Sequence, residues 1–116
     1  MRSTLVVLAL AGLGASALLL HSRNSGAQTS AAAKNAAMVQ AGQQTFTKNC
    51  LLCHTYVQGQ VTFGPNLYGE LKPPHPKKTP AEVRELLKSG KGKMPPFKDK
   101  LTDQDVTNLL AYLHTL

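Results

Sequence analysis

The 116-residue sequence is poor in several kinds of residue, and each shortage narrows its interpretation. It has only two cysteines, so thiol chemistry is confined to one place in the chain. Six acidic residues stand against thirteen Lys and Arg, and the net charge of +7 favours an acidic partner or an anionic membrane surface. Aromatic residues make up 5% and do not alternate with the lysines, which argues against nucleic-acid binding. No internal repeat and no sustained period-two strand pattern is present, so we predict an all-α fold.

The first 27 residues have the features of a targeting segment. Met1-Arg2 is a short basic start, Leu5 to Leu20 is an apolar run, and Ser25-Gly26-Ala27 offers small residues suited to a signal peptidase. The run is long for a signal core but shorter than the about 20 residues of a membrane span. Residues 1–27 are therefore interpreted as a signal peptide or an N-terminal membrane anchor. Both interpretations place the domain outside the cytoplasm, in the periplasm or at the outer face of the cytoplasmic membrane.

The remainder divides into a short lead-in and one domain. Residues 28–37 are small and polar and are predicted to form a flexible linker, followed by a domain over residues 38–116. Apolar residues recur at spacings of three and four in three stretches, two of which begin with a threonine suited to cap a helix. We predict three helices, at about Ala36–Asn49, Pro80–Ser89 and Asp103 to the C-terminus. The segments between them are rich in glycine and proline and are predicted to be long loops.

The five residues Cys50-Leu51-Leu52-Cys53-His54 form a C-x-x-C-H motif, which is typical of c-type haem attachment. Two thiols at this spacing on a helical turn can each add to one haem vinyl group, and the histidine then lies under the iron as the proximal ligand. Both cysteines are used, so one haem is expected. A covalent haem would also complete a core that about 80 residues can barely build alone.

Three other interpretations of the two cysteines stay open. A thioredoxin-like redox pair normally follows a strand in a βαβ pattern, which is missing here. A zinc site would need His75 together with two adjacent ligands, Cys53 and His54, which would be crowded. A disulfide across so short a loop would add little stability.

The chain resembles the small monohaem class I cytochromes c of bacteria, which include soluble photosynthetic and respiratory carriers. The resemblance runs from about Val39 to the C-terminus, and its pieces occur in the order of the family. They are Gly42-x-x-x-Phe46, Cys50-x-x-Cys53-His54, Gly64-Pro65-x-Leu67, Met94-Pro95-x-Phe97 and Leu101-Thr102-Asp103 followed by Ala111-Tyr112-Leu113. The basic, proline-rich segment from Pro73 to Lys78 departs from the pattern.

The resemblance implies a fold in which three helices and long loops surround one covalent haem. It implies thioether bonds from Cys50 and Cys53, and a carbonyl of Pro65 that orients the His54 ring. Met94 would be the distal iron ligand, and its position between glycines and prolines suits a ligand loop. Gly42 and Phe46 would pack against Leu109 and Tyr112, where the terminal helices meet.

The expected function is that of an exported one-electron carrier, which is not an enzyme and acts as a monomer. His/Met ligation would raise the potential, and the iron would cycle between ferrous and ferric. The lysines at positions 48, 91, 93, 98 and 100 are expected to guide transient docking to acidic redox partners. Two alternatives remain. One is an open-site haem sensor or peroxidase, and the other is a small haem subunit of a larger oxidase or dehydrogenase. His75 is the rival candidate for the sixth ligand.

Overall fold

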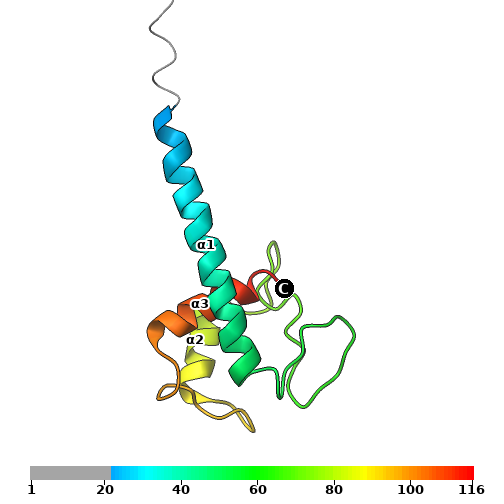
Figure 1. Ribbon diagram of the computed structural model, residues 1–116. Helices are drawn as coiled ribbons and strands as arrows, with labels where there is room; N and C mark the ends of the chain where they lie inside the picture. Colours follow the sequence, from blue (N-terminus) through cyan, green and yellow to red (C-terminus); the bar gives the residue numbers. More distant parts are fainter. Residues whose placement is uncertain (1–21) are drawn as a thin grey trace, which may run out of the picture.

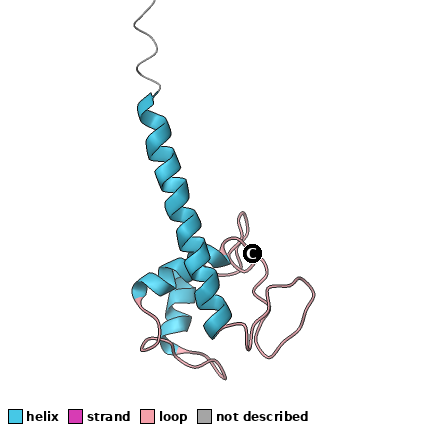
Figure 2. Ribbon diagram, viewed as in Figure 1, coloured by secondary structure: helices cyan, strands magenta, loops and turns pink. Residues whose placement is uncertain are grey.

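The computed structural model describes residues 22–116, and most of the predicted targeting segment lies outside this range. Three helices follow one another along the chain: α1 (Ser22–Asn49), α2 (Pro80–Ser89) and α3 (Asp103–Leu113) (Figures 1 and 2). Long loops connect them, and among the described residues the β structure is confined to one isolated bridge between Lys91 and Met94. The predicted all-α class with three helices is therefore confirmed.

Helix α1 is longer than predicted. It begins at Ser22 instead of about Ala36, so residues 28–37, expected to be a flexible linker, are helical. This segment is rich in alanine, the strongest helix former, and contains no proline. Its residues from 29 to 37 are exposed, and the segment projects away from the body of the protein (Figure 1). Local propensity alone therefore accounts for this part of α1. Within the described residues, no helix combines the length and apolar character needed to cross a bilayer.

The second half of α1 packs against α3, as the sequence predicted. A Cβ atom at Gly42 would overlap the Asn108 carbonyl oxygen and lie 2.8 Å from Cβ of Tyr112. Phe46 is fully buried, and its ring centroid lies 5.6 Å from that of Tyr112. Glycine at position 42 therefore lets the two backbones approach closely, and Phe46 fills the space beside them.

Both shorter helices begin with a capping box. In α2, Thr79 accepts a hydrogen bond from the backbone N–H of Glu82, and Glu82 accepts one from the backbone N–H of Thr79. Thr102 and Asp105 make the same reciprocal pair in α3. These caps place both helix starts where the sequence predicted them.

The buried core is small and lies between the three helices and the loops. It consists of Phe46, Cys50, Leu71, Leu87, Phe97, Leu109, Leu110, Tyr112 and Leu113. Leu71 belongs to the loop between α1 and α2 and is 1% exposed. The same loop is tied to the C-terminus because Nδ1 of His114 lies 2.9 Å from the Leu71 carbonyl oxygen. The loops therefore pack onto the helices and take part in the core.

Candidate functional site

The two cysteines lie on the turn that ends α1. The N–H of Cys50 donates to the Phe46 carbonyl at 2.8 Å, and the N–H of His54 donates to the Cys50 carbonyl at 2.9 Å, so helical hydrogen bonding continues past Asn49. Both thiols are free, with Cys50 buried and Cys53 exposed. Burial raises the pKa of the Cys50 thiol to about 11, so this group is protonated at neutral pH.

The loop that follows holds the ring of His54. Its Nδ1 atom lies 2.8 Å from the carbonyl oxygen of Pro65. A carbonyl can only accept, so Nδ1 carries a proton, and in the neutral imidazole the lone pair is on Nε2. A Cβ atom at Gly64 would lie 2.7 Å from both Cε1 and Nδ1 of the ring, so only glycine leaves room here. The arrangement presents Nε2 as a metal ligand of fixed orientation.

Met94 lies on a tight loop after α2. Its N–H and carbonyl exchange two hydrogen bonds of 3.0 Å with the backbone of Lys91. Gly90 begins this loop with φ of +72°, and a Cβ atom there would lie 2.6 Å from the Met94 carbonyl oxygen. The loop therefore requires glycine at position 90, and it positions a half-buried thioether away from any helix.

Two adjoining cavities bring these groups together. The inner cavity has a volume of about 430 Å³ and the outer cavity about 540 Å³. Both are bordered by Cys50, His54, Lys91 and Met94. Pro65 borders only the inner cavity, and Cys53 only the outer one. All five residues singled out in the sequence therefore converge on one site, although they come from three separate segments of the chain.

The donor set fits a haem. The inner cavity has mostly apolar walls, formed by side chains such as Phe46, Leu71 and Leu109. Such walls would enclose a planar macrocycle, an imidazole and a thioether are groups that bind haem iron in c-type cytochromes, and the two thiols would bond to its vinyl groups. His75 lies exposed and borders neither cavity. Within residues 22–116, no group of three or more His, Cys, Asp and Glu could hold a metal ion, so the zinc interpretation finds no support.

Sequence reasoning missed two features of this site. The first is that Glu70 and Lys78 border the inner cavity. In the sequence, the feature that could have drawn attention to them is that Glu70 is the single acidic residue between the cysteine motif and Glu82. Leu52 and Phe63 border the outer cavity while 90% and 93% exposed, which is unusual for large apolar side chains. The members of each pair are not spaced at a helical period, so the spacing of residues in the sequence could not reveal either feature.

Comparison with known proteins agrees with this geometry. Residues 37–113 match the family described as cytochrome C oxidase, cbb3-type, subunit III. The chain is 30% identical over 73 residues to cytochrome c6 of Leptolyngbya boryana, covering 63% of this chain and 86% of the relative. It is 28% identical over 78 residues to cytochrome c6 of Gracilaria tenuistipitata var. liui, covering 67% of this chain and 72% of the relative. No solved structure matches it significantly. The chain therefore belongs to the monohaem class I cytochromes c, electron carriers with a covalent haem c and its iron, in the family of cbb3-type oxidase subunit III.

Proposed function

We propose that this chain is an exported one-electron carrier whose haem iron is ligated by His54 and Met94. The observation that carries the proposal is that the imidazole and the thioether border the same two cavities, together with the Cys50 thiol. When bound, haem supplies an iron that accepts and releases one electron.

In this proposal, the residues of the chain hold the group and limit rearrangement. Cys50 and Cys53 form the two thioether bonds, which prevent loss of the cofactor outside the cytoplasm. The Pro65 carbonyl accepts a hydrogen bond from Nδ1–H and keeps the His54 ring in one orientation, which makes the imidazole a stronger electron donor. Met94 donates through sulfur, which favours the ferrous state and raises the potential. Both ligand loops are held by backbone hydrogen bonds, so little reorganisation is needed when the charge of the site changes.

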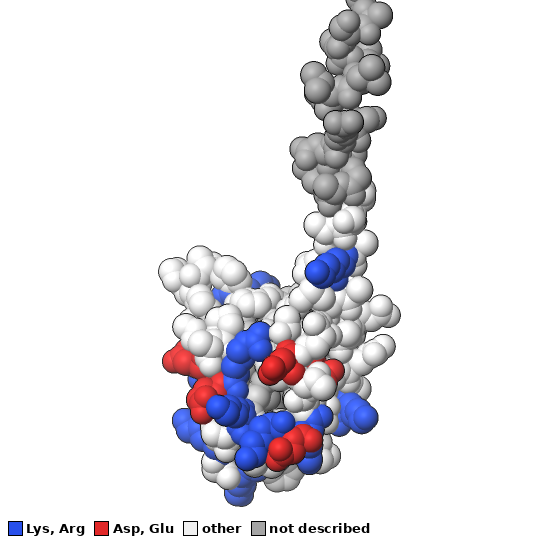
Figure 3. All heavy atoms as spheres, turned by 90° about the vertical axis from the view of Figure 1, so that its left-hand side faces the viewer, with Lys and Arg blue, Asp and Glu red and all other residues white. Residues whose placement is uncertain are grey.

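The outer cavity is the proposed docking face. Four lysines border it, at positions 48, 91, 93 and 100, and no acidic side chain of the described residues does. Exposed Leu52 and Phe63 lie at the same rim. Basic side chains also exceed acidic ones on the face over α2 and the start of α3 (Figure 3). A cationic rim around an apolar centre suits brief contact with an acidic partner, with the charges setting the rate of encounter.

Localisation is proposed from residues 1–27, most of which lie outside the described part of the chain. Export to the periplasm or the outer face of the membrane follows from their signal-like pattern. A second candidate function is that of a small haem subunit within a larger oxidase. The match to a family described as an oxidase subunit favours it. A complex that stays intact at high salt would support this second function over the free carrier.

The ligation is tested by optical spectra of the holoprotein, oxidised and reduced. A ferric iron bound to methionine sulfur gives a weak far-red band, which we expect in the wild type and not in Met94→Ala. Met38→Ala, on α1 and outside both cavities, is the matched control and should keep the band. A wild-type protein that is high-spin, lacks the band and binds carbon monoxide rapidly when ferrous would overturn the proposal in favour of an open-site sensor or peroxidase.

A further inference from the structure

The inner cavity has three charged side chains among its apolar walls. Glu70, Lys78 and Lys91 are the carboxylate and ammonium groups that border it. The side chain of Glu70 is 14% exposed, which is low for a carboxylate and requires cations nearby. Both ion pairs found among the described residues involve Glu70.

The backbone around Glu70 is held from three directions. The preceding N–H, that of Gly69, donates to the carbonyl of Leu116 at 3.2 Å, and the following residue, Leu71, is buried in the core. The Glu70 carbonyl accepts hydrogen bonds from the N–H groups of Lys77 and Lys78, at 2.9 and 3.2 Å. Glu70 therefore closes the basic, proline-rich loop that departs from the family pattern.

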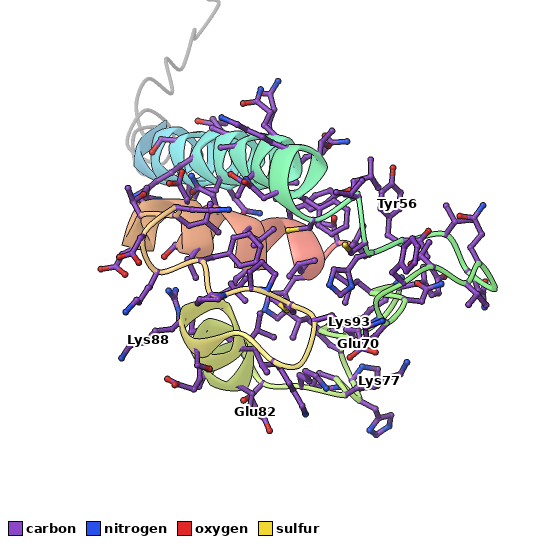
Figure 4. All side chains as sticks on the ribbon, turned by 90° about the horizontal axis from the view of Figure 1, so that it is seen from below. Tyr56, Glu70, Lys77, Glu82, Lys88 and Lys93 are labelled. Atoms are coloured by element: carbon purple, nitrogen blue, oxygen red, sulfur yellow. The ribbon has the colours of Figure 1, made fainter. Side chains whose placement is uncertain are left out.

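The two lysines that end this loop differ in where they lie. Lys77 is 3.2 Å from one carboxylate oxygen of Glu70, is 64% exposed and borders neither cavity (Figure 4). Lys78 is 3.9 Å from the other oxygen, is 44% exposed and borders the inner cavity. Lys77 thus makes the shorter ion pair with Glu70 on the solvent side, and Lys78 makes the longer one beside the inner cavity.

Haem carries two anionic groups that such cations can bind. Its two propionates lie on the edge of the macrocycle opposite the two vinyl groups. The Cys50 thiol borders both cavities and the Cys53 thiol only the outer one, whereas Glu70 and Lys78 border only the inner one. A haem bonded to both thiols would therefore have its propionate edge, which is the edge away from Cys53, nearer to Glu70 and Lys78. Lys91 lies where the cavities meet, beside Met94, whereas Lys78 borders only the inner cavity.

We propose that Lys78, held in place by Glu70, is the cation that binds the propionate edge of the haem, and that this pair adjusts the reduction potential of the carrier. The inference rests on the proposed function. A positive charge near the iron disfavours the ferric state and raises the potential, and a carboxylate does the opposite. Glu70 acts as a positioning residue, because its carbonyl and carboxylate determine where the Lys78 ammonium lies.

The experiment is a spectroelectrochemical titration of the holoprotein for Lys78→Gln, Lys77→Gln, Glu70→Gln and the double variant of residues 70 and 78. We expect a lower potential in Lys78→Gln, both because a cation is lost and because a propionate is left unpaired. Glu70→Gln removes a negative charge, which raises the potential, but it also releases Lys78 from its position, which lowers the potential. The rise caused by Glu70→Gln should therefore be larger in the Lys78→Gln background than in the wild type. Lys77→Gln is the matched control and should shift the potential far less.

Repeating the redox titrations in high salt distinguishes a charge beside the cavity from a more exposed charge. High salt should reduce the shift in Lys78→Gln less than any shift in Lys77→Gln, because the Lys78 side chain is 44% exposed and that of Lys77 is 64% exposed. Equal shifts in the two lysine variants, or none in Lys78→Gln, would overturn the proposal. Such a result in variants that retain the covalent haem spectrum and the far-red band would leave the His54 and Met94 ligation standing. A wild type without that band would instead refute the ligation.

Discussion

The Nδ1 atom of His54 lies 2.8 Å from the carbonyl oxygen of Pro65, eleven residues further along the chain. This contact joins the turn that ends α1 to the loop after it and sets both the tautomer and the orientation of the ring. It depends on Gly64, because any larger residue there would occupy the space of the imidazole.

Gly64→Ala is expected to displace the His54 ring from Pro65. The added methyl would lie 2.7 Å from two ring atoms, and overpacking of this kind costs about 1–3 kcal/mol. The weakened hydrogen bond makes the imidazole a poorer donor, so the potential of the holoprotein should rise. Thermal melts measure the loss of stability, and redox titrations measure the rise in potential. Gly59→Ala is the control, since a Cβ there meets nothing within 4 Å, and it should leave the potential unchanged despite its positive φ.

Gly42→Ala should separate α1 from α3. The new methyl would overlap the Asn108 carbonyl and crowd Tyr112, and both are held in a helix. We expect a loss of at least about 1–3 kcal/mol in the free energy of unfolding. Gln43→Ala, on the exposed side of the same helix, should be nearly neutral. Equal stability of the two variants in denaturant titrations would contradict the close crossing.

The capping boxes predict an acid-sensitive step in stability. Hydrogen bonds from Thr79 hold the pKa of Glu82 below its usual 4.5, and those from Thr102 hold the pKa of Asp105 below 3.8. A lowered native pKa gives stability that is present above the unfolded-state value and is lost as pH falls through the native one. Melting temperature should therefore decline below about pH 4.5. Asp105→Asn should flatten part of this decline, and Asp99→Asn, which caps no helix, should not.

The lysines that border the outer cavity should control the rate of electron transfer to anionic oxidants. Lys93→Glu is expected to slow oxidation by ferricyanide at low salt and to speed oxidation by a cationic cobalt complex, because it reverses a charge at the outer cavity. Stopped-flow rates measured at several ionic strengths test this. Lys34→Glu, on the exposed projecting part of α1, should change neither rate appreciably. If Lys93→Glu and Lys34→Glu changed the oxidation rates equally, the outer cavity would not be a local docking face.

The apoprotein should fold poorly. Six of the nine buried core residues also border the inner cavity, so without haem much of the core faces an empty space. A chain of this size has little other apolar area to bury. Circular dichroism of apoprotein made without haem attachment should show a broad, weakly cooperative melt, against a sharp one for the holoprotein. A sharp haem-independent transition would contradict this expectation.

Local sequence signals were sufficient for much of this protein. Thr79 and Thr102 marked the starts of α2 and α3 because a cap is a contact within four residues. Gly42 and Phe46 indicated the packing face of α1 through helical spacing. Residues 28–37 show the limit of such signals, since their small polar composition suggested a linker although their alanines favour helix.

The sequence by itself determined the helices, the haem motif and, through resemblance, the candidates Pro65 and Met94. Only the tertiary structure decided that these residues meet at two adjoining cavities, and that Glu70 and Lys78 border the inner one. The physical reason is the separation along the chain of the residues that make each feature. Caps, helical periods and C-x-x-C-H are made by neighbours in the chain, whereas the position of a charge in a cavity depends on how distant loops close over a shared core.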